Sequence, residues 1–540
     1  MNRRHFLLVS ASWITAGPSC RSRTADQFPF DGAILGPSHE VGHLLRTPHF
    51  PAPVSQERVA VAIVGGGISG LSAGWKLAKC GVRDFALLEL ENDVGGNSRF
   101  GVNEITPYPW GAHYLPLPTQ ESRAVKELLE ELGVIKGYTA SGEPQYAEEY
   151  VCFAPQERLF LHGRWQEGLL PSVGISAKDR DQYDRFGDLI REFRIRRDLQ
   201  GRKAFAIPMD LSARSKDLLA LDRISMKEFL AQNRLDSEAL HWYVNYACRD
   251  DFGCEYGDVS AWAGIHYFAS RDAKGEELDG TTVLTWPEGN GWIVRRLQKK
   301  LEGRIRAGAL TFSVRPGKPS IVDYYDLREK VSKRLMTDHV ILACPRFLAP
   351  YLIEPVDGEP KTASRGFQYA PWLVANLTLR DLPQQRSGTP LAWDNVIYKG
   401  PSLGYVVATH QSLRTHEDGT VLTYYYPLTG APQEERSRLL HTEWKEWARF
   451  ILQDLQRPHP EIARLVRRVD IFRWGHAMVR PTPGFLWGPD RTHGIQPYQG
   501  LLFAHSDLSG FSIFEEAQYR GVAAAEEVLR RLRVPFSSSI

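Results

Sequence analysis

Three glycines near the start of the chain have the spacing of a phosphate-binding turn. Gly65, Gly67 and Gly70 follow a short β-branched run at residues 59–64 and precede an apolar helical stripe at residues 71–78. In a G-x-G-x-x-G turn of this kind, the first glycine allows a tight bend and the second admits a pyrophosphate. The third lets the helix pack closely on the strand. The turn therefore predicts phosphate binding between a strand and a helix.

A carboxylate follows at the distance expected of a ribose ligand. Glu89 ends a second apolar strand at residues 85–88, about 20 residues beyond the last glycine. Ile68 and Ser69 open the helix between the two strands, and their backbone amides would face the phosphates. Strand, turn, helix and acid in this order predict a dinucleotide-binding cradle, and the acid favours a ribose that carries a free 2′-hydroxyl.

The composition is that of a globular protein with more than one domain. The chain has 540 residues, of which 43% are hydrophobic and 24% are charged, and this length exceeds a single compact core. The 66 basic and 64 acidic residues give a formal net charge of +2, so no overall field attracts nucleic acid and we expect no such partner. Because the cysteines show no CxxC spacing, we also expect no metal site.

The first residues resemble an export signal. Arg3 and Arg4 precede an apolar stretch that small polar residues interrupt and that is too short for a membrane span. This pattern is typical of a twin-arginine signal, and the alternative is a basic, unstructured N-terminus. Cys20 stands where a lipid-modified cysteine would, although residues 17–19 match that signal poorly. We expect a periplasmic or envelope-associated protein, a possible lipid anchor at Cys20, and a signal and linker over residues 1–57.

A second glycine turn makes a family resemblance specific. Gly95, Gly96, Asn97 and Ser98 follow the cradle, and with them the chain resembles the flavin-containing amine oxidase superfamily, which includes protoporphyrinogen oxidases and phytoene desaturases. In that family a Gly-Gly-Arg segment lines FAD. The resemblance implies FAD as the cofactor, with these four residues beside it. Asn97 stands where the family has arginine, so one contact is altered or moved to Arg99.

The closing part of the chain resembles the family's second FAD fingerprint. An apolar strand at residues 500–504 is followed by Asp507, the nearest acid for the ribityl-phosphate side, whereas the family spacing points to Ser506. A helix that begins near Ile513 and Phe514 would direct its amides at the flavin ring. A positive helix end at that place favours the anionic reduced flavin.

Three more candidate residues come from segments between the two FAD fingerprints. His113 lies in a Trp-Gly-Ala-His-Tyr segment and Trp474 in an Arg-Trp-Gly-His-Ala segment, and both segments resemble stretches that lie near the flavin ring in the family. The two are candidate catalytic residues. Each also has a plain alternative, as a structural histidine and a core tryptophan. The resemblance further nominates Val314 as the residue whose backbone contacts the adenine.

A lysine that the resemblance implies is missing. Many amine-oxidising members of the family place a lysine in the strand that corresponds to residues 372–379, where it assists the reaction of reduced flavin with oxygen. The segment APWLVANLTL contains no lysine. This absence argues against a prompt oxidase, and against amine oxidation in particular. It leaves the electron acceptor open between oxygen and another carrier.

The fold predicted from these patterns is α/β. We expect a doubly wound Rossmann-type FAD-binding domain, similar to an NAD(P)-binding domain, with an inserted α+β substrate domain. The FAD-binding domain would be discontinuous and the substrate domain would come from two insertions. Apolar residues at helical spacing predict helices at 124–132, 179–194, 225–233, 237–246 and 434–455. The predicted segments are 58–118, 286–351 and 470–540 for the first domain, and 119–285 and 352–469 for the second.

The function predicted from the sequence is that of an exported FAD-dependent oxidoreductase. It would oxidise an amine-like or other small organic substrate by hydride transfer to flavin, with the protein supplying position and electrostatics. Two alternatives stay open, a flavin-dependent desaturase or isomerase on the same scaffold and a non-catalytic FAD-binding protein. The residues leave the oligomeric state open.

Overall fold

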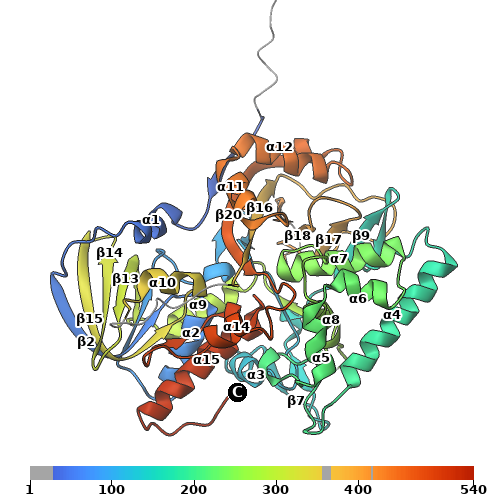
Figure 1. Ribbon diagram of the computed structural model, residues 1–540. Coiled ribbons are helices and arrows are strands. Elements are labelled where there is room, and N and C mark those ends of the chain that lie inside the picture. The colour runs from blue at the N-terminus through green and yellow to red at the C-terminus, as the bar shows by residue number, and fades with distance from the viewer. Residues whose placement is uncertain (1–27, 276, 356–365, 415–417) are drawn as a thin grey trace, which may run out of the picture.

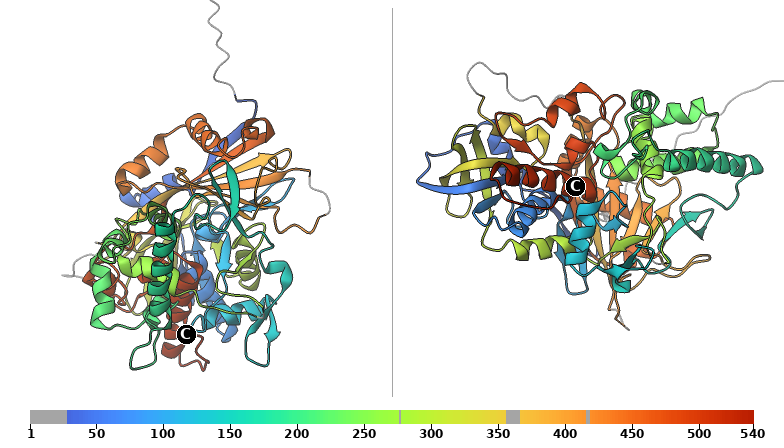
Figure 2. Two further views of the ribbon diagram at one scale, coloured as in Figure 1. Left: turned by 90° about the vertical axis from the view of Figure 1, so that its right-hand side faces the viewer. Right: turned by 90° about the horizontal axis from the view of Figure 1, so that it is seen from below.

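Two β-sheets, one of seven and one of eight strands, form the framework of the molecule. The computed structural model describes residues 28–275, 277–355, 366–414 and 418–540, so Arg3, Arg4 and Cys20 lie outside the described residues. The seven-stranded sheet lies at one end of the molecule and the helices α4 to α8 gather at the other (Figure 1). The right-hand view in Figure 2 shows the same separation.

The seven-stranded sheet is built around the predicted cradle. β2 (Ser55–Val64) pairs in parallel with β3 (Phe85–Glu89) on one side and with β15 (Val331–Leu342) on the other. α2 (Ile68–Lys79) connects β2 to β3, and β21 (Leu502–Phe503) joins β15 in parallel from the far end of the sequence. The sheet is completed by β12 (Ile305–Ala307), β13 (Ala309–Arg315) and β14 (Ser320–Asp326).

The eight-stranded sheet is built mostly from the two segments predicted as the inserted domain. One of its inner strands, β16, is buried along its whole length because apolar clusters cover both of its faces. Helices α11 and α12 lie on one of these faces (Figure 1). In order across the sheet, the strands are β1 (Asp31–Leu35), β20 (Val466–Val479), β16 (Tyr369–Leu379), β19 (Thr420–Pro427), β18 (Gly404–Val407), β17 (Asp394–Ile397), β9 (Glu157–Leu161) and β10 (Arg164–Glu167).

The segment from residue 28 to residue 57 is not the plain linker that the sequence predicted. β1 forms the edge of the eight-stranded sheet by pairing in parallel with β20, and residues 55–57 already belong to β2. Gly32 lies so close to its neighbours that an added Cβ would stand 1.9 Å from the carbonyl oxygen of Val469. The five residues of β1 carry no period-two hydrophobic pattern, which explains why the sequence did not reveal the strand.

Two other boundaries differ from the prediction. The helix predicted over residues 434–455 is two helices, α11 (Pro432–His441) and α12 (Trp444–Leu455). The chain is extended at Thr442, with φ −72° and ψ 130°, which ends the first helix. The chain also returns to the cofactor domain later than residue 470, because β20 continues the eight-stranded sheet as far as Val479.

Most predicted helices are present, and one buried helix was missed. α8 (Ala261–Ala269) is buried at seven of its nine positions, so its sequence has no polar face that would indicate a helix. The helices that match predicted ones are α3 (Arg123–Glu131), α4 (Ala177–Ile195), α6 (Met226–Gln232) and α7 (Glu238–Phe252). The other helices and short strands are α1 (His39–His43), α5 (Lys216–Ala220), α9 (Gly291–Lys300), α10 (Ala349–Leu352), α13 (Ile462–Leu465), α14 (Pro489–Gly494), α15 (Phe514–Arg531), β4 (Phe100–Val102), β5 (Pro107–Pro109), β6 (Tyr114–Pro116), β7 (Ile135–Tyr138), β8 (Pro144–Tyr146) and β11 (Val283–Thr285).

Helices α2 and α15 pack directly on each other. At Gly521 an added Cβ would stand 2.1 Å from the carbonyl oxygen of Ser69, so only glycine allows this approach. Further along, Lys76 of α2 and Glu526 of α15 form an ion pair at 3.2 Å, with side chains 2% and 1% exposed. None of the helices in the described ranges combines the length and the apolarity that a membrane crossing needs.

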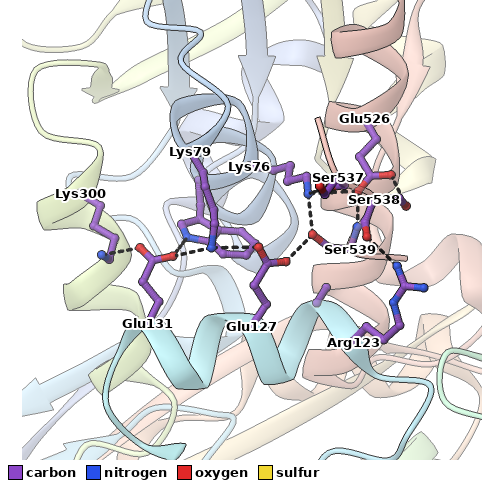
Figure 3. A network of polar contacts seen from close by, with 12 residues as sticks. Lys76, Lys79, Arg123, Glu127, Glu131, Lys300, Glu526, Ser537, Ser538 and Ser539 are labelled. Carbon is purple, nitrogen blue, oxygen red and sulfur yellow. Dashed lines mark hydrogen bonds and ion pairs between the residues drawn. The ribbon is translucent and has the colours of Figure 1, made fainter. Parts of the chain in front are cut away.

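The last residues of the chain cover this buried ion pair, as Figure 3 shows. The Lys76 ammonium donates to the Ser537 carbonyl at 2.8 Å and to the Ser539 hydroxyl at 2.5 Å. Glu526 accepts from the Ser539 amide and from the Ser538 hydroxyl. The segment 537–540 therefore supplies the remaining hydrogen bonds of the pair, and it ties α2 and α15 together.

Candidate cofactor and substrate site

The glycine turn has the geometry that its three roles require. An added Cβ at Gly65 would stand 2.6 Å from the Ala343 carbonyl oxygen, and this residue has a φ of +106°. At Gly70 the added Cβ would stand 1.9 Å from the Gly65 carbonyl oxygen, so this glycine lets α2 pack on the turn. At Gly67 it would meet no atom within 4 Å. The second glycine therefore faces open space, where a bound group can approach the backbone.

That open space is a cavity of about 300 Å³ at the carboxyl end of β2. Residues from both ends of the sequence line this cavity: those of the two N-terminal glycine turns and those at the start of α15. Gly70 lies beneath the turn and does not line the cavity. The predicted residues that line it are Gly65, Gly67, Ile68, Ser69, Glu89, Gly95, Gly96, Asn97, Ser98, Ile513 and Phe514.

Glu89 lies at the cavity wall and is held by backbone amides. Its Oε2 accepts from the Gly66 amide at 2.7 Å and its Oε1 from the Glu91 amide at 2.9 Å. Burial raises the pKa of this carboxyl, and the two amides and Arg99 oppose that shift. Because each carboxylate oxygen has a second lone pair, the amides orient the group and leave it able to accept from a ribose hydroxyl.

The arrangement fits FAD. The first turns of α2 and α15 both open on the same cavity, so two sets of free amides and two positive helix ends meet there. A diphosphate and the polar edge of a flavin are the anionic or electron-rich groups that such ends favour. In addition, the space in front of Gly67 admits a group that any side chain would obstruct.

The adenine contact nominated at Val314 is not at the cavity. Ala309, Leu310 and Thr311 of the same strand line it instead. Val314 is fully buried, and its carbonyl accepts a hydrogen bond from the amide of Glu354. Val314 therefore lies on a strand that reaches the cavity but is itself outside it, because the part of β13 that lines the cavity depends on where the strand starts.

Asp507 also lies away from the cavity. Its side chain is 0% exposed, and one oxygen accepts from the Arg346 amide at 2.7 Å and from the Tyr369 hydroxyl at 2.6 Å. His505 and Ser506 line the cavity in its place, as the family spacing indicated for Ser506. Burial opposes ionisation of Asp507, but the nearby His505 and these donors hold its pKa below the usual range. Asp507 thus anchors the loop that carries the two cavity residues.

Asn97 connects the cofactor cavity to the eight-stranded sheet. Its Nδ2 donates to the Ala477 carbonyl at 2.6 Å, and its own carbonyl accepts from the Ala112 amide at 2.9 Å. Arg99, the alternative location for the missing arginine contact, pairs with Glu91 at 3.4 Å and lines neither this cavity nor its neighbour. The arginine contact has therefore not moved to Arg99.

A second cavity of about 130 Å³ adjoins the first on the substrate side. Apolar and aromatic side chains form most of its wall, and those of Trp372, Val374 and Tyr425 come from strands β16 and β19 of the eight-stranded sheet. No lysine is among the residues that line either cavity. The two cavities have in common the residues Asn97, Ala112, Ala477, Ser512, Ile513 and Phe514.

Both ring residues predicted near the flavin line this second cavity. The ring of His113 stacks on Tyr425 with centroids 4.5 Å apart, and burial lowers the pKa of His113 to about 4, which makes it neutral at pH 7. The indole nitrogen of Trp474 donates to the Trp110 carbonyl at 2.6 Å. His113 and Trp474 are therefore fixed parts of the wall.

The sequence did not indicate the charged groups of this cavity. Asp250, Asp251, Glu515 and Arg271 line it, and Arg271 pairs with Asp251 at 3.0 Å. Burial raises the pKa of Asp250 to about 7, with a contribution from Asp251. These residues come from α7, the loop after α8 and the start of α15, so no short motif contains them. The one local signal is the pair of adjacent acids, Glu515 and Glu516, in the first turn of α15.

Metal-binding clusters do not occur in the described ranges. Within them, no three histidine, cysteine or acidic side chains are arranged to hold an ion. The cysteines at positions 80, 152, 248, 254 and 344 are all free.

Comparisons with known proteins agree with this geometry. A family model described as an NAD(P)-binding Rossmann-like domain matches residues 63–132. The search of curated proteins finds no match. Among solved structures, a double mutant of putrescine oxidase is 16% identical with a TM-score of 0.64, and the alignment covers 88% of this chain and 100% of that one.

Two further solved structures widen the range of chemistry on this fold. Cyclohexylamine oxidase from Brevibacterium oxydans IH-35A is 15% identical with a TM-score of 0.62, covering 88% of this chain and 99% of that one. A CLA-producing fatty acid isomerase from P. acnes is 15% identical with a TM-score of 0.57, covering 87% and 98%. The chain therefore has the α/β fold of these amine oxidases, built on a Rossmann-like dinucleotide-binding domain.

Proposed function

We propose that this protein is an FAD-dependent oxidoreductase that oxidises a small amine. The supporting observation is the charge of the second cavity, which adjoins the dinucleotide cavity. Three carboxyl groups line it, those of Asp250, Asp251 and Glu515, but only one guanidinium, that of Arg271. An excess of acidic groups in a buried space favours a cationic ligand. Amines are cations at neutral pH, so the charge of the cavity argues for an amine more strongly than the missing lysine argues against one.

The protein contributes position and the exclusion of water to this reaction. Bound FAD would supply the hydride acceptor. The aromatic wall formed by His113, Tyr425 and Trp474 shields a substrate carbon from solvent, and aromatic faces also attract a cation. The volume of about 130 Å³ limits the substrate to a small molecule or to the end of a longer one.

The electron acceptor we propose is a carrier other than oxygen. The strand that corresponds to the lysine-bearing strand of oxidases is β16, and its residues at the cavity are Trp372 and Val374. Neither side chain can hold a water by charge or promote oxygen reduction. Slow reoxidation of the reduced protein in air, compared with rapid reoxidation by an artificial acceptor such as a quinone, would support this assignment.

We also propose that the protein is exported by the twin-arginine route. The support is the Arg3–Arg4 pair with its short apolar stretch, together with a cofactor cavity formed by both ends of the sequence. Such a cavity closes around FAD only after the whole chain has folded, which suits a route for folded proteins. Replacing both arginines by lysine should leave the protein in the cytoplasmic fraction, and unchanged export would contradict the proposal.

The amine assignment is tested by anaerobic reduction of the bound flavin. We expect putrescine or cyclohexylamine to bleach the flavin, while their N-acetylated forms, which carry no positive charge, leave it oxidised. The variant Asp250→Asn removes one of the carboxyls and should weaken reduction by the amine. Equal reduction by charged and acetylated compounds would contradict a cation-binding cavity.

A further inference from the structure

Glu515 occupies an unusual position between two cavities. Glu515 is 3% exposed and lines the acidic cavity of about 130 Å³, called the substrate cavity below. It also lines a separate, very small cavity of about 10 Å³ together with Ser539 and Ile540. This volume is close to that needed by one water molecule. Glu515 is therefore a residue that the proposed substrate space shares with a water-sized space near the protein surface.

Within the described residues, no other residue forms a hydrogen bond with the Glu515 carboxyl group. Across the described ranges, its carboxylate receives a hydrogen bond only from its own backbone amide. Its neighbour Glu516 differs, because it accepts from the Met209 amide and faces the Arg520 guanidinium. A buried acid without a partner is costly to maintain as an ion, which makes it ready to take up a proton.

The charges around Glu515 place its titration in the neutral range. Burial raises its pKa to about 7, and the Arg271 guanidinium opposes this shift. Asp251 and Glu516 add to it. The other titratable or charged side chains that line the two cavities with it are His113, Tyr114, Asp250, Glu121, Arg123 and Tyr519.

We propose that Glu515 exchanges protons between the substrate cavity and solvent. This inference rests on the proposed amine oxidation, because an ammonium group must lose a proton before the nitrogen lone pair can assist hydride loss from the adjacent carbon. In this step the N–H bond of the ammonium breaks and an O–H bond forms on Glu515. The carboxyl then releases the proton to water in the small cavity, whose edge includes the exposed Arg123.

A pH titration of the oxidised, FAD-loaded protein tests this role without any substrate. Because Glu515 adjoins Ile513 and Phe514 at the cofactor cavity, ionisation should shift the flavin absorption spectrum. We expect a transition near pH 7 in the wild type that disappears in Glu515→Gln and returns in Glu515→Asp. Asp250→Asn is the control, since it removes another acid of the substrate cavity and should keep the transition. A transition that persists in Glu515→Gln would overturn the proposal.

The rate of anaerobic flavin reduction by cyclohexylamine is the second measurement. In the wild type it should rise with pH through about 7, because the proton-accepting form of Glu515 is the ionised one. In Glu515→Gln this rise should be lost and the rate at pH 7.5 should fall about 100-fold. An unchanged pH profile would overturn the proposal. If no amine reduces the wild-type flavin, the proposed function fails, and the spectral titration still decides whether Glu515 titrates beside the flavin.

Discussion

Single residues decide whether the cradle binds its cofactor. Gly67 and Gly70 belong to the same turn but face different surroundings. An added Cβ meets nothing at Gly67, and it stands 1.9 Å from the Gly65 carbonyl oxygen at Gly70. Gly67 therefore leaves space for the ligand, and Gly70 allows the helix to pack on the turn. The sequence motif alone does not show this difference.

This contrast predicts opposite results for two substitutions. Gly67→Val should fold and melt near the temperature of the FAD-free wild type, because its φ of −71° suits any residue and the side chain points into the cavity. The purified variant should lack FAD. Gly70→Val should fail to give soluble protein. Absorption spectra and thermal melting of the two variants check the prediction, and full FAD occupancy in Gly67→Val would contradict the assignment of the turn.

Asp250 should make the stability of the protein depend on pH. Burial, with a contribution from Asp251, raises the pKa of Asp250 to about 7. Its unfolded-state pKa is about 4. The contribution of Asp250 to the free energy of unfolding is therefore fully present below about pH 4 and is lost as the pH rises through about 7. Asp250→Asn removes this loss. We expect the variant to match the wild type at pH 4.5 and to exceed its unfolding free energy by on the order of 2 kcal/mol at pH 8. Denaturant unfolding at fixed FAD concentration measures the difference, and a gap that stays constant with pH would contradict the assignment.

Among the secondary-structure elements, helices α2 and α15 contribute most to the geometry of the cofactor site. Each helix begins at the cofactor cavity, and the Lys76–Glu526 pair with the segment 537–540 joins them further along (Figure 3). The distance between the two helix starts is therefore fixed by contacts that lie outside the cavity.

The buried pair predicts a large loss of stability. Lys76→Met leaves Glu526 as an uncompensated buried charge and should cost about 3 kcal/mol. Lys79→Met is the matched control on the same helix, because Lys79 forms its ion pairs with Glu127 and Glu131 at 37% exposure and should cost less than about 1 kcal/mol. Chemical denaturation of both variants measures the two values, and equal costs would show that burial of the pair is unimportant.

How much the sequence predicted depended on how local each pattern was. The cradle over residues 59–89 is one continuous stretch with a fixed geometry, so its strands and helix were identified correctly, and of its predicted binding residues all but Gly70 line the cavity. Val314 and Asp507 were each placed one to a few residues away from the cavity, because strand starts and loop paths depend on packing. The acids of the substrate cavity come from positions about 265 residues apart in the sequence, such as Asp250 and Glu515, and no local pattern relates them.

At the scale of the whole molecule, the site lies where the two sheets meet. Asn97 bonds to Ala477 of β20, so the cofactor domain and the eight-stranded sheet are linked beside the cavities. The order of that sheet ends at β1, and Phe30, the residue just before this strand, contacts Trp444 of α12. The N-terminal part of the chain thus protects the edge of the sheet that carries the substrate wall.

Removal of β1 should expose that edge. A chain that starts at Gly36 loses the parallel pairing with β20 and leaves unpaired backbone groups along an edge strand, a surface that promotes association. We expect dimers or larger aggregates in size-exclusion chromatography with light scattering. A chain that starts at residue 28 keeps β1 and is the control. A stable, non-associating protein without β1 would show that the strand does not protect the edge.

The claim that unites these scales is that the molecule holds FAD beside an acidic cavity that binds an amine. Its most direct test is an anaerobic titration of the purified, flavin-loaded protein with cyclohexylamine, followed by its absorption spectrum. We expect cyclohexylamine to bleach the flavin completely and N-acetylcyclohexylamine to leave it oxidised. A protein that purifies without flavin, or a flavin that stays oxidised with every amine, would contradict it.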